Sequence, residues 1–202
     1  MSSRTLFVGD VHGCANELET MLQLAEPTRC ILVGDMFRKG PDELGVWHLI
    51  QSHQLEAVLG NHELVVLKKR KKYPLDLVQW VEQLPLWIEG EGNQNGQPIS
   101  WRVVHAGVDP FHPKRTTRKQ AVSMRRYPND KSKLFPFWWQ VYKKKRLVIY
   151  GHDAKRGLQD HRPKTLGLDS GCVYGNGLTG YLLEEDRLIQ VPSQAIHLPI
   201  VE

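Results

Sequence analysis

Short apolar runs alternate with stretches of helical periodicity in the first third of the chain. The runs at residues 5–8, 30–33 and 56–59 are four residues long and mostly apolar, which is typical of buried strands. Between them, residues 17–25 and 41–50 carry apolar side chains at helical spacing, and Pro27 follows the first of these stretches. The order strand, helix, strand, helix, strand predicts a βαβαβ unit with a parallel sheet.

The remainder of the chain predicts a second sheet. Further strand-like runs occupy residues 84–88, 99–104 and 147–150, and residues 179–183 and 188–191 are typical of a closing hairpin. Residues 89–98 are rich in Gly, Asn and Gln, so we expect a turn there. Helical patterns cover residues 60–67 and 73–81. Residues 109–146 are basic, proline-containing and irregular, and we expect them to face the substrate.

Potential metal ligands follow five of the predicted strands directly. The five motifs are Gly9-Asp10-Val11-His12, Gly34-Asp35, Gly60-Asn61-His62, His105-Ala106-Gly107 and Gly151-His152. The carboxyl ends of strands in open α/β sheets are where ligands bind, so these side chains are predicted to meet at one edge. Oxygen and imidazole ligands suit divalent ions such as Mn, Fe, Zn or Co, and two such ions about 3.5–4 Å apart can clamp a phosphoryl group while activating water.

In this order, the five motifs resemble those of the phosphoprotein phosphatase branch of the calcineurin-like metallophosphoesterases. GDVHGC at 9–14, KGPD at 39–42, GHDAKRGLQ at 151–159 and GLDSGCVYGNGLTG at 167–180 more narrowly resemble the ApaH-like phosphatases and bacterial diadenosine tetraphosphatase. The resemblance covers nearly the whole chain. It implies an α/β fold with a βαβαβ core, in which two mixed β-sheets pack together and are flanked by helices.

The resemblance also implies a ligand set and a mechanism. Two divalent metal ions are expected, Mn first, with Fe, Zn, Co or Mg as alternatives, and Asp35 bridges them. Asp10, His12 and Asp35 hold one ion, and Asp35, Asn61, His105 and His152 hold the other. A hydroxide activated by both metals attacks phosphorus in line, and His62 protonates the leaving oxygen. Lys39 binds the transferred phosphoryl group.

The second motif departs from the phosphoprotein phosphatase pattern. That branch usually carries GDxxDRG, in which the second Asp orients the catalytic His and the Arg holds phosphate. Arg38 and Lys39 occupy those two places here, so the His-Asp dyad is absent and the orienting partner of His62 is not identified. The change matches the ApaH-like branch, in which Lys is usual at the second place. Arg38, Arg125 and Arg156 are further candidates for phosphate contacts.

Length and composition constrain the setting of this chemistry. With 202 residues, of which 41% are hydrophobic, we expect one domain spanning residues 1–202. No signal peptide or membrane-spanning run is recognised, so a cytoplasmic protein with no membrane contact is expected. The three cysteines lack metal-site or disulfide spacing and are expected to be reduced thiols. A net charge of +5 suits an acidic partner, and nothing in the sequence indicates an obligate protein partner.

Several other features have a plain structural interpretation. Five histidines lack the strand-end context and are interpreted as surface or structural residues: His48, His53, His112, His161 and His197. Asp169 is interpreted as structural or as a support for the metal ligands, because the ligand set implied by the resemblance is already filled. Asp42 is expected to cap its helix or to place a charge in the first turn. The basic run at residues 68–72 is either a solvated helix end or a rim that steers phosphate-rich substrates. The Trp138-Trp139 pair is either core or a platform on which a base stacks.

The leading hypothesis is a metal-dependent phosphohydrolase that cleaves phosphoanhydride bonds of nucleoside polyphosphates, either dinucleoside tetraphosphates or related RNA 5′ caps. A protein phosphatase acting on phosphoserine, phosphothreonine or phosphotyrosine and an endopolyphosphatase are the enzymatic alternatives. A binding module with a degenerate site belongs to a different class, and the presence of every ligand position argues against it.

Overall fold

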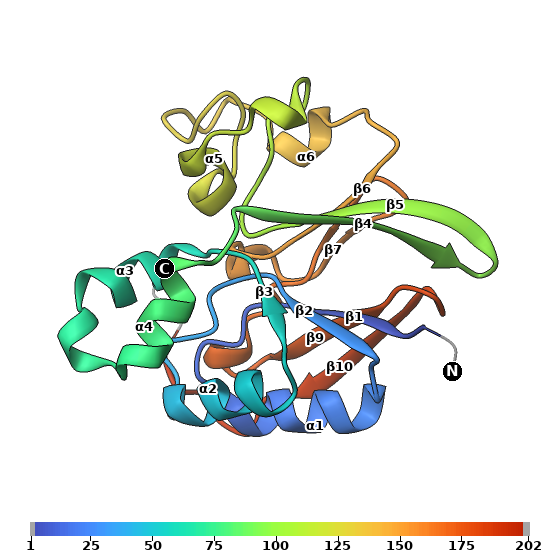
Figure 1. The fold of residues 1–202 in the computed structure, drawn as a ribbon. Coiled ribbons are helices and arrows are strands. Elements are labelled where there is room, and N and C mark those ends of the chain that lie inside the picture. Colours follow the sequence, from blue (N-terminus) through green and yellow to red (C-terminus); the bar gives the residue numbers. More distant parts are fainter. Residues whose placement is uncertain (1–2, 200–202) are drawn as a thin grey trace.

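The computed structural model describes residues 3–199 and contains two five-stranded sheets packed face to face (Figure 1). The first sheet has the order β10-β9-β1-β2-β3 and the second has the order β4-β5-β6-β8-β7. The strands of the first sheet are β1 (Thr5–Val8), β2 (Arg29–Leu32), β3 (Glu56–Ala57), β9 (Gly177–Leu182) and β10 (Arg187–Pro192). Those of the second are β4 (Trp87–Gln94), β5 (Gln97–Val104), β6 (Leu147–Tyr150), β7 (Gln159–His161) and β8 (Thr165–Gly167).

Both sheets are mixed, as expected. The strands β1, β2 and β3 pair in parallel and β9 and β10 pair antiparallel. In the second sheet, β5, β6 and β8 are parallel, whereas β4 and β7 add antiparallel edges. The βαβαβ prediction is confirmed by the element order β1, α1 (Ala15–Ala25), β2, α2 (Glu43–Ser52) and β3.

Alternation along the buried strands separates the core into two layers. In β1, Phe7 packs between the sheets with Ile31 and Trp101, whereas Leu6 and Val8 belong to the layer beneath the helices. This division follows because successive strand residues point to opposite faces. Figure 1 shows α1 and α2 along the outer face of the first sheet. The carboxyl ends of the central strands are therefore fixed by buried packing on both faces.

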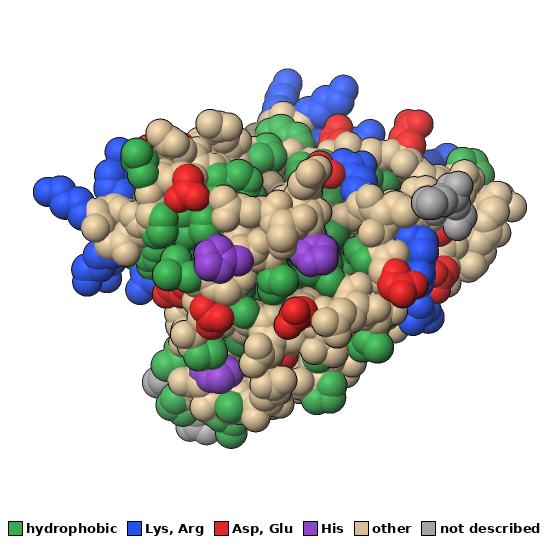
Figure 2. All heavy atoms as spheres, turned by 60° about the horizontal axis from the view of Figure 1, so that its bottom comes forward, with side chains coloured by type: hydrophobic (Ala, Val, Ile, Leu, Met, Phe, Trp, Pro, Cys, Tyr) green, Lys and Arg blue, Asp and Glu red, His purple; other side chains and the backbone are tan. Residues whose placement is uncertain are grey.

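The other helices lie around the ends of the sheets. They are α3 (Asn61–Lys68), α4 (Leu75–Glu82), α5 (Arg118–Ser123) and α6 (Trp138–Val141). The Asp42 side chain accepts a hydrogen bond from the Gly45 amide and caps α2, as predicted. Residues 68–72 are exposed, and Figure 2 shows Lys and Arg side chains projecting from the left margin, the side on which Figure 1 places α3 and α4.

A turn does separate the two strands, but the prediction that it spans all of residues 89–98 is wrong. Strand β4 continues to Gln94, and only Asn95 and Gly96 lie between it and β5. The glycines that suggested a turn instead make room for a neighbour: a Cβ on Gly90 would lie 2.3 Å from the ring of Trp101, its cross-strand partner. Strands β7 and β8 were not predicted, because three residues each are too few to show a period.

Helical segments in the described residues are short. Among residues 3–199, no helix combines the length and apolar character needed to cross a bilayer. The three cysteines are buried free thiols, in agreement with the expectation from their spacing.

Candidate active site

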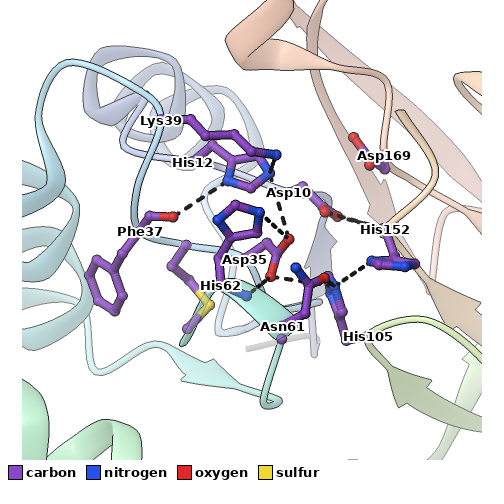
Figure 3. Close-up of polar contacts among 12 residues, drawn as sticks. Asp10, His12, Asp35, Phe37, Lys39, Asn61, His62, His105, His152 and Asp169 are labelled. Carbon is purple, nitrogen blue, oxygen red and sulfur yellow. Dashed lines mark hydrogen bonds and ion pairs between the residues drawn. The ribbon is translucent and has the colours of Figure 1, made fainter. Parts of the chain in front are cut away.

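The motif side chains meet at the carboxyl ends of β1, β2, β3, β5 and β6 (Figure 3). They border a cavity of about 650 Å³. Of the predicted site residues, the cavity is lined by Asp10, His12, Asp35, Lys39, Asn61, His62, Arg125, His152 and Arg156. His105 is fully buried directly behind it, and Arg38 is not among the lining residues.

Glycines beside the predicted ligands give their side chains the space to converge. A Cβ on Gly151 would lie 1.9 Å from Asp10 Oδ1, and a Cβ on Gly60 would lie 2.3 Å from Asp35 Oδ1. Any side chain at either position would displace a carboxylate. The glycines at these two positions are thus a packing requirement of the site.

The backbone at three predicted ligands is strained. His12, Asp35 and His152 have φ values of 49°, 51° and 73°, in the left-handed region that non-glycine residues seldom occupy. Such conformations cost of the order of 1–3 kcal/mol each and persist only where the surroundings enforce them. Their occurrence at three residues of one cavity marks it as a functional site.

One cluster of donor atoms surrounds His105. The Nδ1–H of this ring donates to Val33 O at 3.0 Å, which leaves a lone pair on Nε2. This nitrogen lies 3.0 Å from Asn61 Oδ1, 3.2 Å from His152 Nδ1 and 3.4 Å from Asp35 Oδ1. Burial lowers the pKa of His105 to about 3, so the ring is neutral near pH 7. A cation would relieve the repulsion between these facing lone pairs.

A second cluster lies on the other side of Asp35. His12 Nε2 and His62 Nε2 lie 3.6 and 3.9 Å from Asp35 Oδ2. Burial, followed by the charge of Lys39, lowers the pKa of His12 well below its usual value. Asp10, which the resemblance assigns to this side, instead has both carboxylate oxygens within 3.2 Å of the His152 amide, which donates to them. Asp35 is therefore the carboxylate shared by both clusters.

The ionisation of these groups fits divalent cations. Burial raises the pKa of Asp35 to about 7. Burial, followed by the charges of Asp169 and Asp35, raises the pKa of Asp10 well above its usual value. Neutral imidazoles and crowded carboxylates are the donor set that Mn²⁺ or Zn²⁺ binds. The buried His152 Nε2 and His62 Nδ1 have no hydrogen-bond partner among residues 3–199.

Cationic side chains lie on the cavity wall. Lys39 Nζ is 3.2 Å from His12 Nε2 and donates to Tyr174 OH at 3.1 Å. Arg125 donates to His152 O at 2.9 Å and pairs with Asp153, whose other oxygen lies 3.5 Å from Arg156. Asp153 thus holds two guanidinium groups at the rim. Fixed cations of this kind favour a polyanionic ligand.

Other residues singled out in the sequence lie outside this cavity. Trp138 is buried and donates to Ala106 O at 3.0 Å, which confirms its interpretation as core. The Trp139 ring stacks on Phe137 and His161 rather than on the cavity. None of His48, His53, His112, His161 and His197 lines the cavity, nor does any residue of the 68–72 run.

Sequence reasoning missed several residues that line or support the cavity, among them Glu63, Asp153 and Tyr174. Glu63 is fully buried and its carboxylate accepts hydrogen bonds from the Asp35, Met36 and Gly60 amides. Asp169 and Tyr174 line the cavity, although Asp169 was interpreted as structural or as a support for the ligands. Glu63 follows two predicted site residues in the chain, and this adjacency was the available signal. Tyr174 lies within the GLDSGCVYGNGLTG motif at 167–180 that carried the resemblance, and this was the available signal for it.

Comparisons with known proteins agree with this geometry. The family model described as calcineurin-like phosphoesterase matches residues 3–184. A crystal structure provisionally named a diadenosine tetraphosphatase superposes with a TM-score of 0.84 and 31% identity over 96% of this chain and 95% of that one. The symmetrical bis(5′-nucleosyl)-tetraphosphatase of Aeromonas hydrophila is 25% identical over 92% of this chain and 96% of its own length.

A further relative carries a different activity in its name. The zinc-dependent endopolyphosphatase of Saccharomyces cerevisiae is 27% identical over 92% of this chain and 77% of its own length. The chain therefore belongs to the calcineurin-like phosphoesterase family and is a metal-dependent hydrolase of phosphate ester or anhydride bonds.

Proposed function

We propose that the chain hydrolyses a phosphoanhydride bond of dinucleoside tetraphosphates. The observation that carries this proposal is that the two clusters of donor atoms share Asp35 and lie in a cavity lined by cationic side chains. These cationic side chains are Lys39, Arg125 and Arg156. Two divalent cations bound there, Mn²⁺ being our first choice, would supply an activated water and charge stabilisation for the phosphoryl group. The ligands proposed for one cation are Asp10, His12 and Asp35, and those for the other are Asp35, Asn61, His105 and His152.

His62 is proposed to protonate the leaving oxygen. Its amide donates to Asp35 Oδ1 at 2.9 Å, and its ring lies on the cavity wall beside His12. Burial, then the charges of Lys39 and Arg38, lower its pKa to about 3 in the free protein. A bound tetraphosphate places negative charge beside the ring and raises that pKa, so substrate itself helps His62 to acquire the proton it transfers.

Charge distribution favours a substrate with several phosphates. Residues 109–146 contain twelve Lys and Arg and only two acidic residues, whereas the rest of the chain contains fifteen Lys and Arg and twenty acidic residues. Arg125 connects this basic segment to the cavity wall. A tetraphosphate bridge presents about four charges, so it gains more from this surface than a phosphate monoester does.

Endopolyphosphatase activity is the second candidate, and the relative of that name in Saccharomyces cerevisiae favours it. Long-chain polyphosphate offers the same anhydride bonds and charge without a nucleoside. The protein phosphatase alternative is less well supported, because Arg38 and Lys39 replace the Asp and Arg of that branch.

A substrate panel with purified protein and Mn²⁺ tests the proposal. We expect kcat/KM for diadenosine tetraphosphate to exceed that for a phosphopeptide by at least about 100-fold, which is about 2.7 kcal/mol of transition-state discrimination. Capped RNA and long-chain polyphosphate complete the panel. An Asp35→Asn variant prepared in parallel should lose the activity, which excludes a contaminating phosphatase. Equal turnover of phosphopeptide and tetraphosphate would refute the proposal, and preference for long-chain polyphosphate would favour the second candidate.

A further inference from the structure

The segment that follows β10 returns to the active-site cavity. Residues 193–199 run from the end of the hairpin to the cavity, where Leu198 and Pro199 form part of its lining. Tyr174, in the short helix η4 (Cys172–Tyr174), also lines the cavity and adds an aromatic ring. These three residues belong neither to the proposed ligands nor to the phosphate contacts.

A buried carboxylate fixes the start of this segment. Glu17, in α1, is 3% exposed, and its Oε1 accepts a hydrogen bond from the Gln194 amide at 2.8 Å. The neighbouring Asn16 donates to Gln194 Oε1 at 3.1 Å. A buried carboxylate is costly unless it is paired, so this contact is a built anchor and not a chance approach.

The end of the segment is fixed by η4. Val173 O accepts hydrogen bonds from both the His197 and Leu198 amides, each at 3.1 Å. Ile196 lies over Gly175, where an added Cβ would come within 2.5 Å of Ile196 Cγ1. Val173, which accepts both hydrogen bonds, precedes Tyr174 in η4. Tyr174 and Leu198 are therefore positioned together in the cavity lining.

The cavity lining combines two kinds of chemistry. Arg125, Arg156 and Lys155 offer charges that suit phosphate, whereas Tyr174, Leu198 and Pro199 offer an aromatic ring and aliphatic carbon. Lys39 connects the two sets, because its Nζ donates to Tyr174 OH and its charge lies over the Tyr174 ring at 5.4 Å. A phosphate gains nothing from an aliphatic wall, but a nucleoside buries apolar surface against it.

We propose that Tyr174, Leu198 and Pro199 form a subsite for a nucleoside of the substrate, positioned by the anchored 193–199 segment. This inference rests on the proposed function, because a nucleoside-free substrate would leave the subsite without a ligand. The subsite would make the enzyme distinguish a dinucleoside tetraphosphate from an inorganic polyphosphate of the same charge.

The test compares a tetraphosphate that carries two nucleosides with one that carries none. For Leu198→Ala we expect KM for diadenosine tetraphosphate to rise about 5-fold, the loss expected from removing part of a half-buried leucine contact. For inorganic tetraphosphate, kcat/KM should stay within about twofold of wild type. Glu17→Ala, which releases the anchor, should reproduce the selective effect, and Leu44→Ala, which changes an exposed leucine in α2, should not.

Equal changes for both substrates in Leu198→Ala would overturn the subsite, and so would a gain for both, which would mean that the segment obstructs the cavity. If wild-type protein does not hydrolyse diadenosine tetraphosphate at all, the proposed function itself fails and the subsite fails with it. The wild-type measurement therefore separates the two failures.

Discussion

The buried carboxylate of Glu63 provides a quantitative test of how the metal site is built. Its Oε2 accepts from the Asp35 amide at 2.8 Å and the Gly60 amide at 3.0 Å, and its Oε1 accepts from the Met36 amide at 3.0 Å. These contacts connect the motif after β2 to the start of α3. They also support the left-handed backbone of Asp35, the carboxylate shared by both donor clusters.

Glu63→Ala would leave four buried amides without an acceptor, because the Phe37 amide also donates to Oε1, at 3.4 Å. An unsatisfied buried donor costs about 1–3 kcal/mol, so the four together imply a loss of about 3–5 kcal/mol once water enters the space vacated by the side chain. Glu63→Gln retains one oxygen but turns an NH₂ group toward amide donors, so it should lose about half as much. We also expect metal affinity to fall about 10-fold to 100-fold, the usual effect of removing a residue that orients a ligand.

Urea denaturation in the presence of a chelator measures the change in the free energy of unfolding without a contribution from bound metal. The matched control is Glu19→Ala, an exposed glutamate in α1 that should change the free energy of unfolding by no more than about 0.5 kcal/mol. Isothermal titration with Mn²⁺ gives the change in metal affinity. A loss below about 1 kcal/mol for Glu63→Ala would show that the four amides find other acceptors, which would refute this explanation of the site.

Three further predictions concern catalysis and metal binding. His62→Ala should lower kcat by about 10²-fold to 10⁴-fold without changing metal content, and less for substrates with good leaving groups; an equal loss for good and poor leaving groups would argue against a general acid. Lys39→Ala should lower kcat as well as raise KM. The wild-type preference for tetraphosphate over phosphopeptide should decrease with added salt, since exposed charges are screened beyond about 8–10 Å, and a preference that is independent of salt would contradict the charge argument. Because burial raises the pKa of Asp35 to about 7, a proton competes with the cation for this carboxylate below that pH. The affinity for Mn²⁺ should therefore be full above pH 7 and weaken as the pH falls, and equal affinities at pH 7.5 and 5.5 by calorimetry would contradict this assignment.

Most of the fold around the site could be predicted from the sequence, because its determinants are local. A buried strand followed by a ligand type occurs five times, and in four of these a glycine stands between the two. The packing of Gly60 and Gly151 against Asp35 and Asp10 gives the physical reason for the glycine. Each motif needs only the few residues around it. The alternation of Phe7 with Leu6 and Val8 likewise follows from strand geometry alone.

The features that were missed depend on contacts between distant segments. The prediction of a turn over all of residues 89–98 failed because Gly90 is explained by Trp101 across the sheet. Glu63 acquires its role only when β2 and α3 come together, and residues 193–199 reach the cavity through contacts with α1 and η4. No local pattern encodes such pairings. The orienting partner of His62 also stays unassigned, since Nδ1 has no partner in residues 3–199.

The central claim is that this cavity hydrolyses dinucleoside tetraphosphates with two divalent cations that share Asp35 as a ligand. Its most direct test is the rate of diadenosine tetraphosphate hydrolysis by chelator-stripped, dialysed protein as Mn²⁺ is added back. We expect no activity without metal, full recovery as two equivalents bind, and no recovery in Asp35→Asn, while His48→Ala, outside the cavity, behaves as wild type. Full activity of wild-type protein in excess chelator, or a wild-type rate for Asp35→Asn, would contradict the account.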